Sequence, residues 1–139
     1  MKDFTTYLIF DGNAGEAMTF YQSCFDAQLD MQNFSAGPCP VPPGAENRIM
    51  HARLTKGPIV LMASDTMPGM PFQSGNNFSI AVHCETMDET QKLFTTLSEG
   101  GNVTMPLQDT FWGAHFGMLT DKFGVNWMLN LDKDSGTQS

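Results

Sequence analysis

Two histidines, one aspartate and one aromatic pair are the residues of this chain whose types could form a binding or reacting site. His51 lies in the segment RIMHARL, and His115 lies in the similar segment GAHFGMLT. An imidazole can act as a base, a hydrogen-bond donor or a metal ligand near neutral pH. Asp65 offers a carboxylate, and Phe111 with Trp112 offers a flat apolar wall with one N–H donor. We predict that these five residues line a ligand-binding site.

Each of these residues also has a structural interpretation. The histidines could be hydrogen-bonded strand residues, and Asp65 could accept backbone hydrogen bonds in a loop. Phe111 and Trp112 could pack in the core, as we expect for Trp127, which has apolar neighbours in the same register of a terminal strand.

The eleven methionines raise a further hypothesis, that of a soft-metal site. Met31, Met62, Met105 and Met128 fall on separate expected strands and form no Met-x-x-Met array. Adaptable packing around an apolar cavity is therefore the favoured interpretation.

Composition limits the class of protein. The chain has 139 residues, enough for one domain with a core of its own, and its net charge is -8. This acidity argues against a nucleic-acid partner and against an anionic membrane surface. Three widely spaced cysteines without a CxxC pattern are typical of reduced thiols, and no segment has the pattern of a signal peptide or membrane span. We expect a cytoplasmic protein.

Hydrophobic periodicity predicts the elements that must position the candidate residues. Asn13 and Glu16 have capping-box spacing before a helix over 14–25, and Thr86 and Glu89 have it before a helix within 86–101. Period-two alternation and apolar runs predict strands over 4–10, 27–34, 47–56, 58–64, 77–84, 102–108, 113–120 and 125–131.

The two halves repeat one pattern. A shift of 74 residues aligns Phe4 with Phe78 and Leu8 with Val82, and later shifts of 64 and 67 align His51 with His115 and then Gly57 with Gly124. The repeated unit is βαβββ, at 1–65 and 76–132 of one domain over 1–132, followed by a disordered tail at 133–139. We predict an α+β fold whose eight strands form a curved, mainly antiparallel sheet that encloses a cavity.

This doubled unit resembles the vicinal oxygen chelate superfamily, which includes glyoxalase I, extradiol dioxygenases and bleomycin-resistance proteins. The stretches YLIFDGNAGEAMTFYQSCFDAQL, RIMHARL, LMASDTMPG and MPLQDTFWGAHFGMLTDKFGVNWMLN are similar to its PhnB-like branch, often labelled 3-demethylubiquinone methyltransferase-like. A methyl-donor site is not expected, because no parallel nucleotide-binding unit with a glycine-rich turn is present.

The resemblance also implies where a metal would bind, namely on the first and last strand of each repeat. Met128 stands where a ligating glutamate would be, the corresponding place in the first half is at or near Leu61, and the opening strands offer no histidine or carboxylate at the matching places. Thioether and alkyl groups do not bind hard or borderline divalent ions. We therefore expect no metal and no other cofactor.

From these observations we predict a small-molecule-binding protein that holds an apolar or aromatic ligand between its two sheet units. Two alternatives stay open: a metal-dependent lyase, isomerase or dioxygenase with His51, His115 and Asp65 as noncanonical ligands, and an interaction subunit without a ligand. Whether the chain is an enzyme is left open. The resemblance also implies a homodimer, for which unpaired sheet edges supply a physical motive.

Overall fold

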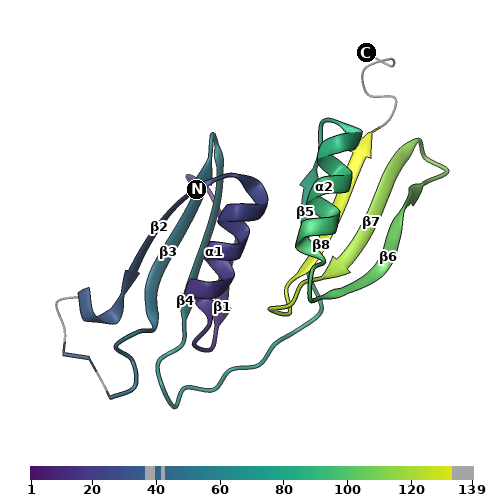
Figure 1. The fold of residues 1–139 in the computed structure, drawn as a ribbon. Coiled ribbons are helices and arrows are strands. Elements are labelled where there is room, and N and C mark those ends of the chain that lie inside the picture. The colour runs from purple at the N-terminus through teal and green to yellow at the C-terminus, as the bar shows by residue number, and fades with distance from the viewer. Residues whose placement is uncertain (37–39, 42, 133–139) are drawn as a thin grey trace. The chain divides into compact units, whose positions relative to one another are not determined.

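The computed structural model describes residues 1–36, 40–41 and 43–132, and the chain divides into two compact units, Met1–Gln73 and Ser74–Ser139 (Figure 1). The predicted tail at 133–139 lies outside the described residues. The prediction of one domain concerns how the two units pack together and stays a prediction. No helix in the described ranges is long and apolar enough to cross a membrane.

The first unit is one four-stranded sheet with a helix. Its elements are β1 (Tyr7–Phe10), α1 (Ala14–Phe25), β2 (Gln28–Asn33), a 3-10 turn (Phe34–Ala36), β3 (Ile49–Lys56) and β4 (Ile59–Asp65). The strand order is β1-β4-β3-β2. Strands β1 and β4 are parallel, whereas β4 with β3 and β3 with β2 are antiparallel.

The second unit repeats this topology. Its elements are β5 (Ile80–His83), α2 (Met87–Leu97), β6 (Asn102–Asp109), β7 (Ala114–Thr120) and β8 (Asn126–Asp132), in the sheet order β5-β8-β7-β6. Two βαβββ units and an α+β fold are thus confirmed. The expectation of one eight-stranded sheet is wrong for the described residues, because their strands form two mixed sheets of four.

In each unit the helix packs on one face of the sheet, which we call the helix face, and we call the other the open face. Helix α1 contacts β2, β3 and β4, and α2 contacts β7 and β8. Alternate strand residues in the first unit are buried with α1, namely Leu8, Phe10, Ala52, Leu54, Leu61 and Ala63. Residues that alternate with them along the strands, such as Tyr7 and Arg53, therefore lie on the open face.

Helix α2 packs closely on its sheet at a glycine. A Cβ atom added to Gly117 on β7 would lie 2.7 Å from Cε1 of Phe94. Around this contact Trp127, Leu129 and Leu119 are almost fully buried. The expectation that Trp127 is a core residue is confirmed.

The two helices begin differently. Thr86 caps α2 as predicted, because its Oγ1 accepts a hydrogen bond of 3.1 Å from the Glu89 N–H. The side chain of Asn13 forms no cap hydrogen bond at α1, so the first predicted capping box is wrong. A carboxylate from the end of β4 replaces it, because the Ala14 N–H donates to Oδ1 of Asp65 at 2.9 Å.

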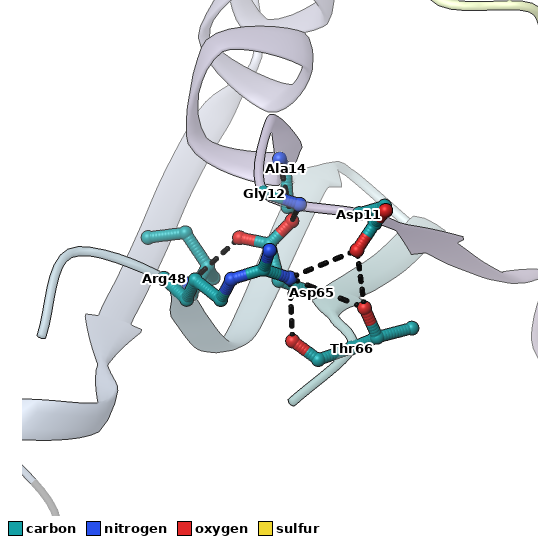
Figure 2. Close-up of polar contacts among 7 residues, drawn as sticks. Asp11, Gly12, Ala14, Arg48, Asp65 and Thr66 are labelled. Carbon is teal, nitrogen blue, oxygen red and sulfur yellow. Dashed lines mark hydrogen bonds and ion pairs between the residues drawn. The ribbon is translucent and has the colours of Figure 1, made fainter. Parts of the chain in front are cut away.

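Asp65 joins three segments of the first unit (Figure 2). Its Oδ1 also accepts a 2.7 Å hydrogen bond from the Gly12 N–H, and its Oδ2 accepts one of 2.8 Å from the Ile49 N–H. The side chain is only 5% exposed. One buried carboxylate therefore holds the β1–α1 turn, the start of β3 and the end of β4 together.

An exposed ionic network lies beside Asp65 (Figure 2). Nη1 of Arg48 donates to Oδ1 of Asp11 at 3.1 Å and to the carbonyl oxygen of Thr66 at 2.8 Å. The Thr66 hydroxyl donates to the same Asp11 oxygen at 2.8 Å. The hydroxyl of Thr66, then the guanidinium of Arg48, lowers the pKa of Asp11 below its ordinary value.

The second unit has its own buried carboxylate, Asp121, which is 3% exposed. Its Oδ1 accepts hydrogen bonds from the N–H groups of Phe123 and Val125, and its Oδ2 accepts one of 2.8 Å from Nε1 of Trp127. Asp121 therefore fixes the β7–β8 turn and satisfies the indole of the largest core side chain.

We predict that Asp65→Ala lowers the free energy of unfolding by about 3 kcal/mol or more, because three N–H groups lose their acceptor. Urea unfolding followed by circular dichroism measures this. Asp11→Ala is the matched control: its carboxylate is half exposed, so removing it is expected to lower the free energy of unfolding much less. Equal losses in the two variants would contradict the role given to Asp65.

We predict that Thr66→Val raises the pKa of Asp11 toward its ordinary value, since the Thr66 hydroxyl is the largest cause of its lowering. A lowered folded pKa means that this carboxylate stabilises the fold fully above the ordinary Asp pKa of about 3.9. The stabilisation is lost as pH falls through the folded value. An NMR titration of the Asp11 carboxyl measures the pKa, with Thr19→Val as the control; an unchanged value in Thr66→Val would refute the assignment.

Candidate functional site

His51 lies on the open face of the first sheet. It is directly opposite Gln32 of β2 and two residues from Arg53, which shares its face. Its ring is tilted 37° against the ring of Tyr7 on β1, with the ring centroids 6.1 Å apart. The half-buried imidazole and the phenol thus form one aromatic pair with polar edges, on the side of the sheet that no helix covers in this unit.

His115 lies on the helix face of the second sheet, because it alternates with Gly117 and Leu119 along β7. Its Nδ1 is 2.9 Å from Oδ1 of Asp109 on β6. The imidazole is 15% exposed, whereas the carboxylate is 63% exposed. A carboxylate at Nδ1 orients the ring and fixes its tautomer, which leaves Nε2 as the hydrogen-bond acceptor when the ring is neutral.

The strand registers define which residues of the two repeats correspond. Leu8 lies opposite Ala63 in the first unit, and Val82, its partner under the shift of 74, lies opposite Leu129 in the second. Ala63 and Leu129 are therefore equivalent positions of β4 and β8.

This equivalence corrects the predicted alignment of the histidines. Ala63 lies opposite Ala52, and Leu129 lies opposite Gly117, so the preceding residues, His51 and Phe116, correspond to each other. The predicted pairing of His51 with His115 is wrong by one residue. A slip of one residue moves a strand side chain to the other face, which is why the two histidines lie on different kinds of face.

Phe111 and Trp112 lie in the turn between β6 and β7 and are 97% and 57% exposed. Their rings meet edge to face, with centroids 4.9 Å apart. Trp112 also contacts the ring of Phe116 on the open face, with the two ring centroids 6.2 Å apart. Core packing within this unit does not account for either residue, and their role in contacting a ligand stays a prediction.

The predicted site residues occupy four places, two within each unit. Phe111 and Trp112 are together, His115 pairs with Asp109, and His51 pairs with Tyr7. Asp65 lies on the helix face of the sheet that carries His51 on its open face, because it is opposite the buried Phe10. Both Asp65 oxygens accept main-chain hydrogen bonds, which matches its alternative, structural interpretation.

Sequence reasoning missed three partners of these residues: Tyr7, Asp109 and Phe116. Tyr7 and Phe116 alternate with buried neighbours, and this signal could have assigned them to the open face once the strand registers were known. Asp109 gives no such signal, since two β-bulge irregularities in β6 shift its register before it reaches His115.

The implied divalent metal does not fit the residues at the places that the resemblance indicates. Leu61 is buried on the helix face, and Met128 lies on β8 between the methionine and alanine of the neighbouring strands. Among the described residues no group of three or more His, Cys, Asp or Glu side chains could hold a metal ion. No step through a divalent metal follows from this geometry.

Cys84, just after β5, is a cysteine whose protonation the structure perturbs. Burial raises the pKa of its thiol. A nucleophilic cysteine needs the opposite shift, toward the thiolate. Cys84 is therefore a half-buried neutral thiol and not a candidate nucleophile.

Comparison with known proteins gives the family. The model of the family described as 3-demethylubiquinone-9 3-methyltransferase matches residues 2–130. The crystal structure of protein PA1353 from Pseudomonas aeruginosa is 42% identical and has a TM-score of 0.87, covering 95% of this chain and 98% of that one. A putative 3-demethylubiquinone-9 3-methyltransferase, PhnB protein, from Bacillus cereus is 34% identical with a TM-score of 0.80, covering 94% and 99%.

A more distant likeness concerns the fold alone. A glyoxalase/bleomycin resistance protein/dioxygenase family enzyme from Burkholderia phytofirmans is 16% identical and has a TM-score of 0.61, over 91% of this chain and 97% of that one. The doubled βαβββ topology and these matches agree. The chain therefore belongs to the 3-demethylubiquinone-9 3-methyltransferase family, in its PhnB-like form, and has the fold of the glyoxalase/bleomycin resistance proteins.

Proposed function

We propose that this chain binds a small apolar or aromatic molecule through the aromatic pairs on the open faces of its sheets. One observation carries the proposal. His51 and Phe116 occupy equivalent positions of the two repeats, and each contacts a second aromatic ring. The ring centroids are 6.1 Å apart for His51 and Tyr7 and 6.2 Å apart for Phe116 and Trp112.

The side chains around these pairs suit such a ligand. Tyr7 is 44% exposed although it is large and mostly apolar, and Ile9 and Met62 lie near it on the same face. Paired rings bind flat apolar groups through offset or edge contacts. His51 and Trp112 add a few N–H groups that could orient one polar substituent, which is the usual composition of a small-molecule site.

Methyl transfer is not part of the proposal, although the family carries that name. Nucleotide-type cofactors bind at the carboxyl ends of parallel strands, beside a glycine-rich turn into a helix. Here the corresponding turn, from β1 into α1, donates its Gly12 and Ala14 N–H groups to Asp65. Those donors are therefore already engaged inside the protein.

The metal-dependent alternative would require rearrangement. Asp65 would have to give up the hydrogen bonds that it accepts from Gly12, Ala14 and Ile49 before it could bind an ion. The His115–Asp109 pair by itself favours proton transfer as a second candidate function, because a carboxylate at Nδ1 is the arrangement that holds an imidazole as a general base.

We predict that the neutral fluorescent probe N-phenyl-1-naphthylamine binds this protein and that His51→Ala or Trp112→Ala weakens its affinity about tenfold. A tenfold change is about 1.4 kcal/mol, in the range expected for losing one aromatic contact pair. Probe fluorescence is titrated against each variant. Phe4→Ala is the matched control, since Phe4 is an 88% exposed ring outside both pairs and outside β1.

The outcomes separate the candidate functions. Weaker binding in both variants with an unchanged Phe4→Ala supports the proposal. A probe that fails to bind the parent protein would overturn it in favour of an interaction subunit without a ligand. Equal binding by the parent and both variants would overturn the assignment of the aromatic pairs. Circular dichroism of each variant shows that the fold is retained.

A further inference from the structure

Three methionines form a row across the open face of the second sheet. Met105 on β6 lies directly opposite Met118 on β7, and Met118 lies directly opposite Met128 on β8. Met118 and Met128 alternate in sequence with Gly117 and Leu129, which lie on the helix face, so the row lies on the other side. All three side chains are half-buried. Because the three methionines are far apart in sequence, the row is evident only from the pairing of the strands.

The neighbouring rows of the same face hold polar side chains and one imidazole. On one side Gln108, Phe116 and Asn130 lie opposite one another, with the exposed His83 of β5 opposite Asn130, and on the other side Thr120 pairs with Asn126. The Thr120 hydroxyl donates to Oδ1 of Asn126 at 2.6 Å, so that pair is satisfied internally. The thioethers thus have amide, hydroxyl and ring neighbours but no carboxylate or ammonium group in these rows.

Thioether sulfur is a soft, neutral ligand that favours monovalent soft ions such as Cu(I) over Mg²⁺, Ca²⁺ or Zn²⁺. Directly opposed residues on neighbouring strands are separated by about 4.8 Å, the strand spacing. Zinc–thiolate bonds are about 2.3 Å long, and two metal–sulfur bonds of similar length in line span roughly the strand spacing. Neighbouring methionines of the row can therefore approach one ion from two strands, and the third can complete the coordination.

We propose that Met105, Met118 and Met128 form a binding site for a soft monovalent metal ion, Cu(I) or its redox-inert analogue Ag(I). Each sulfur donates a lone pair, and no electron or proton is transferred on binding. The site differs from the divalent site of metal-dependent relatives in both ligand type and metal class. It also does not depend on the proposed small-molecule function.

The first unit supplies a matched control. Met62 of β4 is the residue equivalent to Met128 of β8, because it precedes Ala63 as Met128 precedes Leu129. The residues opposite Met62 on the neighbouring strands are Tyr7 and Arg53 instead of methionines. A phenol and a guanidinium cannot complete a thioether site, and the positive charge of Arg53 repels a cation. Met62→Leu therefore removes a methionine of equivalent location without removing a predicted ligand.

The experiment uses silver nitrate as the probe, in chloride-free buffer, because chloride precipitates silver. The full chain carries Cys24→Ser, Cys39→Ser and Cys84→Ser, since free thiols would bind the ion more tightly than thioethers. Ag(I) binding is measured by isothermal titration calorimetry and by native mass spectrometry. Leucine is the replacement for methionine because it conserves volume and apolar character.

We expect one Ag(I) per cysteine-free chain, at least tenfold weaker binding in Met118→Leu, and unchanged binding in Met62→Leu. Competition with the Cu(I) chelator bicinchoninate under reducing conditions is expected to give the same order of affinities. Absence of binding in the cysteine-free parent, or equal effects of Met118→Leu and Met62→Leu, would overturn the proposal. Met105→Leu and Met128→Leu repeat the test if Met118→Leu alters the circular dichroism spectrum.

Discussion

The packing of one helix on one face of each four-stranded sheet is the constraint on which the rest of the structure depends. Strand side chains alternate between two faces, so burying one set against a helix places the other set on a face without a helix. Leu8, Phe10 and Leu54 belong to the first set, and Tyr7 and His51 belong to the second. The aromatic pairs and the methionine row are consequences of this alternation.

Two buried aspartates stabilise the units without taking part in their proposed chemistry. Asp65 and Asp121 are almost fully buried, and each accepts three hydrogen bonds from N–H groups of its own unit. A buried carboxylate is tolerated when such donors surround it. Asp65 also explains how α1 begins without a side-chain cap from Asn13, because its carboxylate takes the Ala14 N–H.

The sequence was sufficient to predict most elements, because apolar periodicity is a local signal. Helix α1 has the predicted bounds, and each predicted strand corresponds to an observed one. Strand β1 begins later than predicted, at Tyr7, since Phe4 is 88% exposed and contributes nothing to the core. Local patterns also predict the cap at Thr86. They do not predict that Asn13 leaves α1 uncapped, because the acceptor that replaces it is the carboxylate of Asp65, 52 residues away in sequence.

The candidate sites were less predictable because they depend on register between distant strands. The predicted repeat alignment is wrong by one residue: it makes His115 the equivalent of His51, whereas the strand registers make Phe116 the equivalent residue. Bulges in β6 decide that Asp109 meets His115 and that Met105 meets Met118. Single-sequence patterns contain no signal for such bulges, so neither the histidine–aspartate pair nor the methionine row could be derived from spacing.

The central claim is that the open faces, and not the helix faces, contact the ligand. The most direct test is a methyl-13C methionine NMR spectrum of the chain, recorded with and without saturating N-phenyl-1-naphthylamine. Met62 and Met118 lie on open faces, whereas Met18 of α1 is fully buried on a helix face. If the open faces bind the probe, the Met62 and Met118 methyl signals shift while that of Met18 does not. A shift of Met18 with unmoved Met62 and Met118 would contradict it.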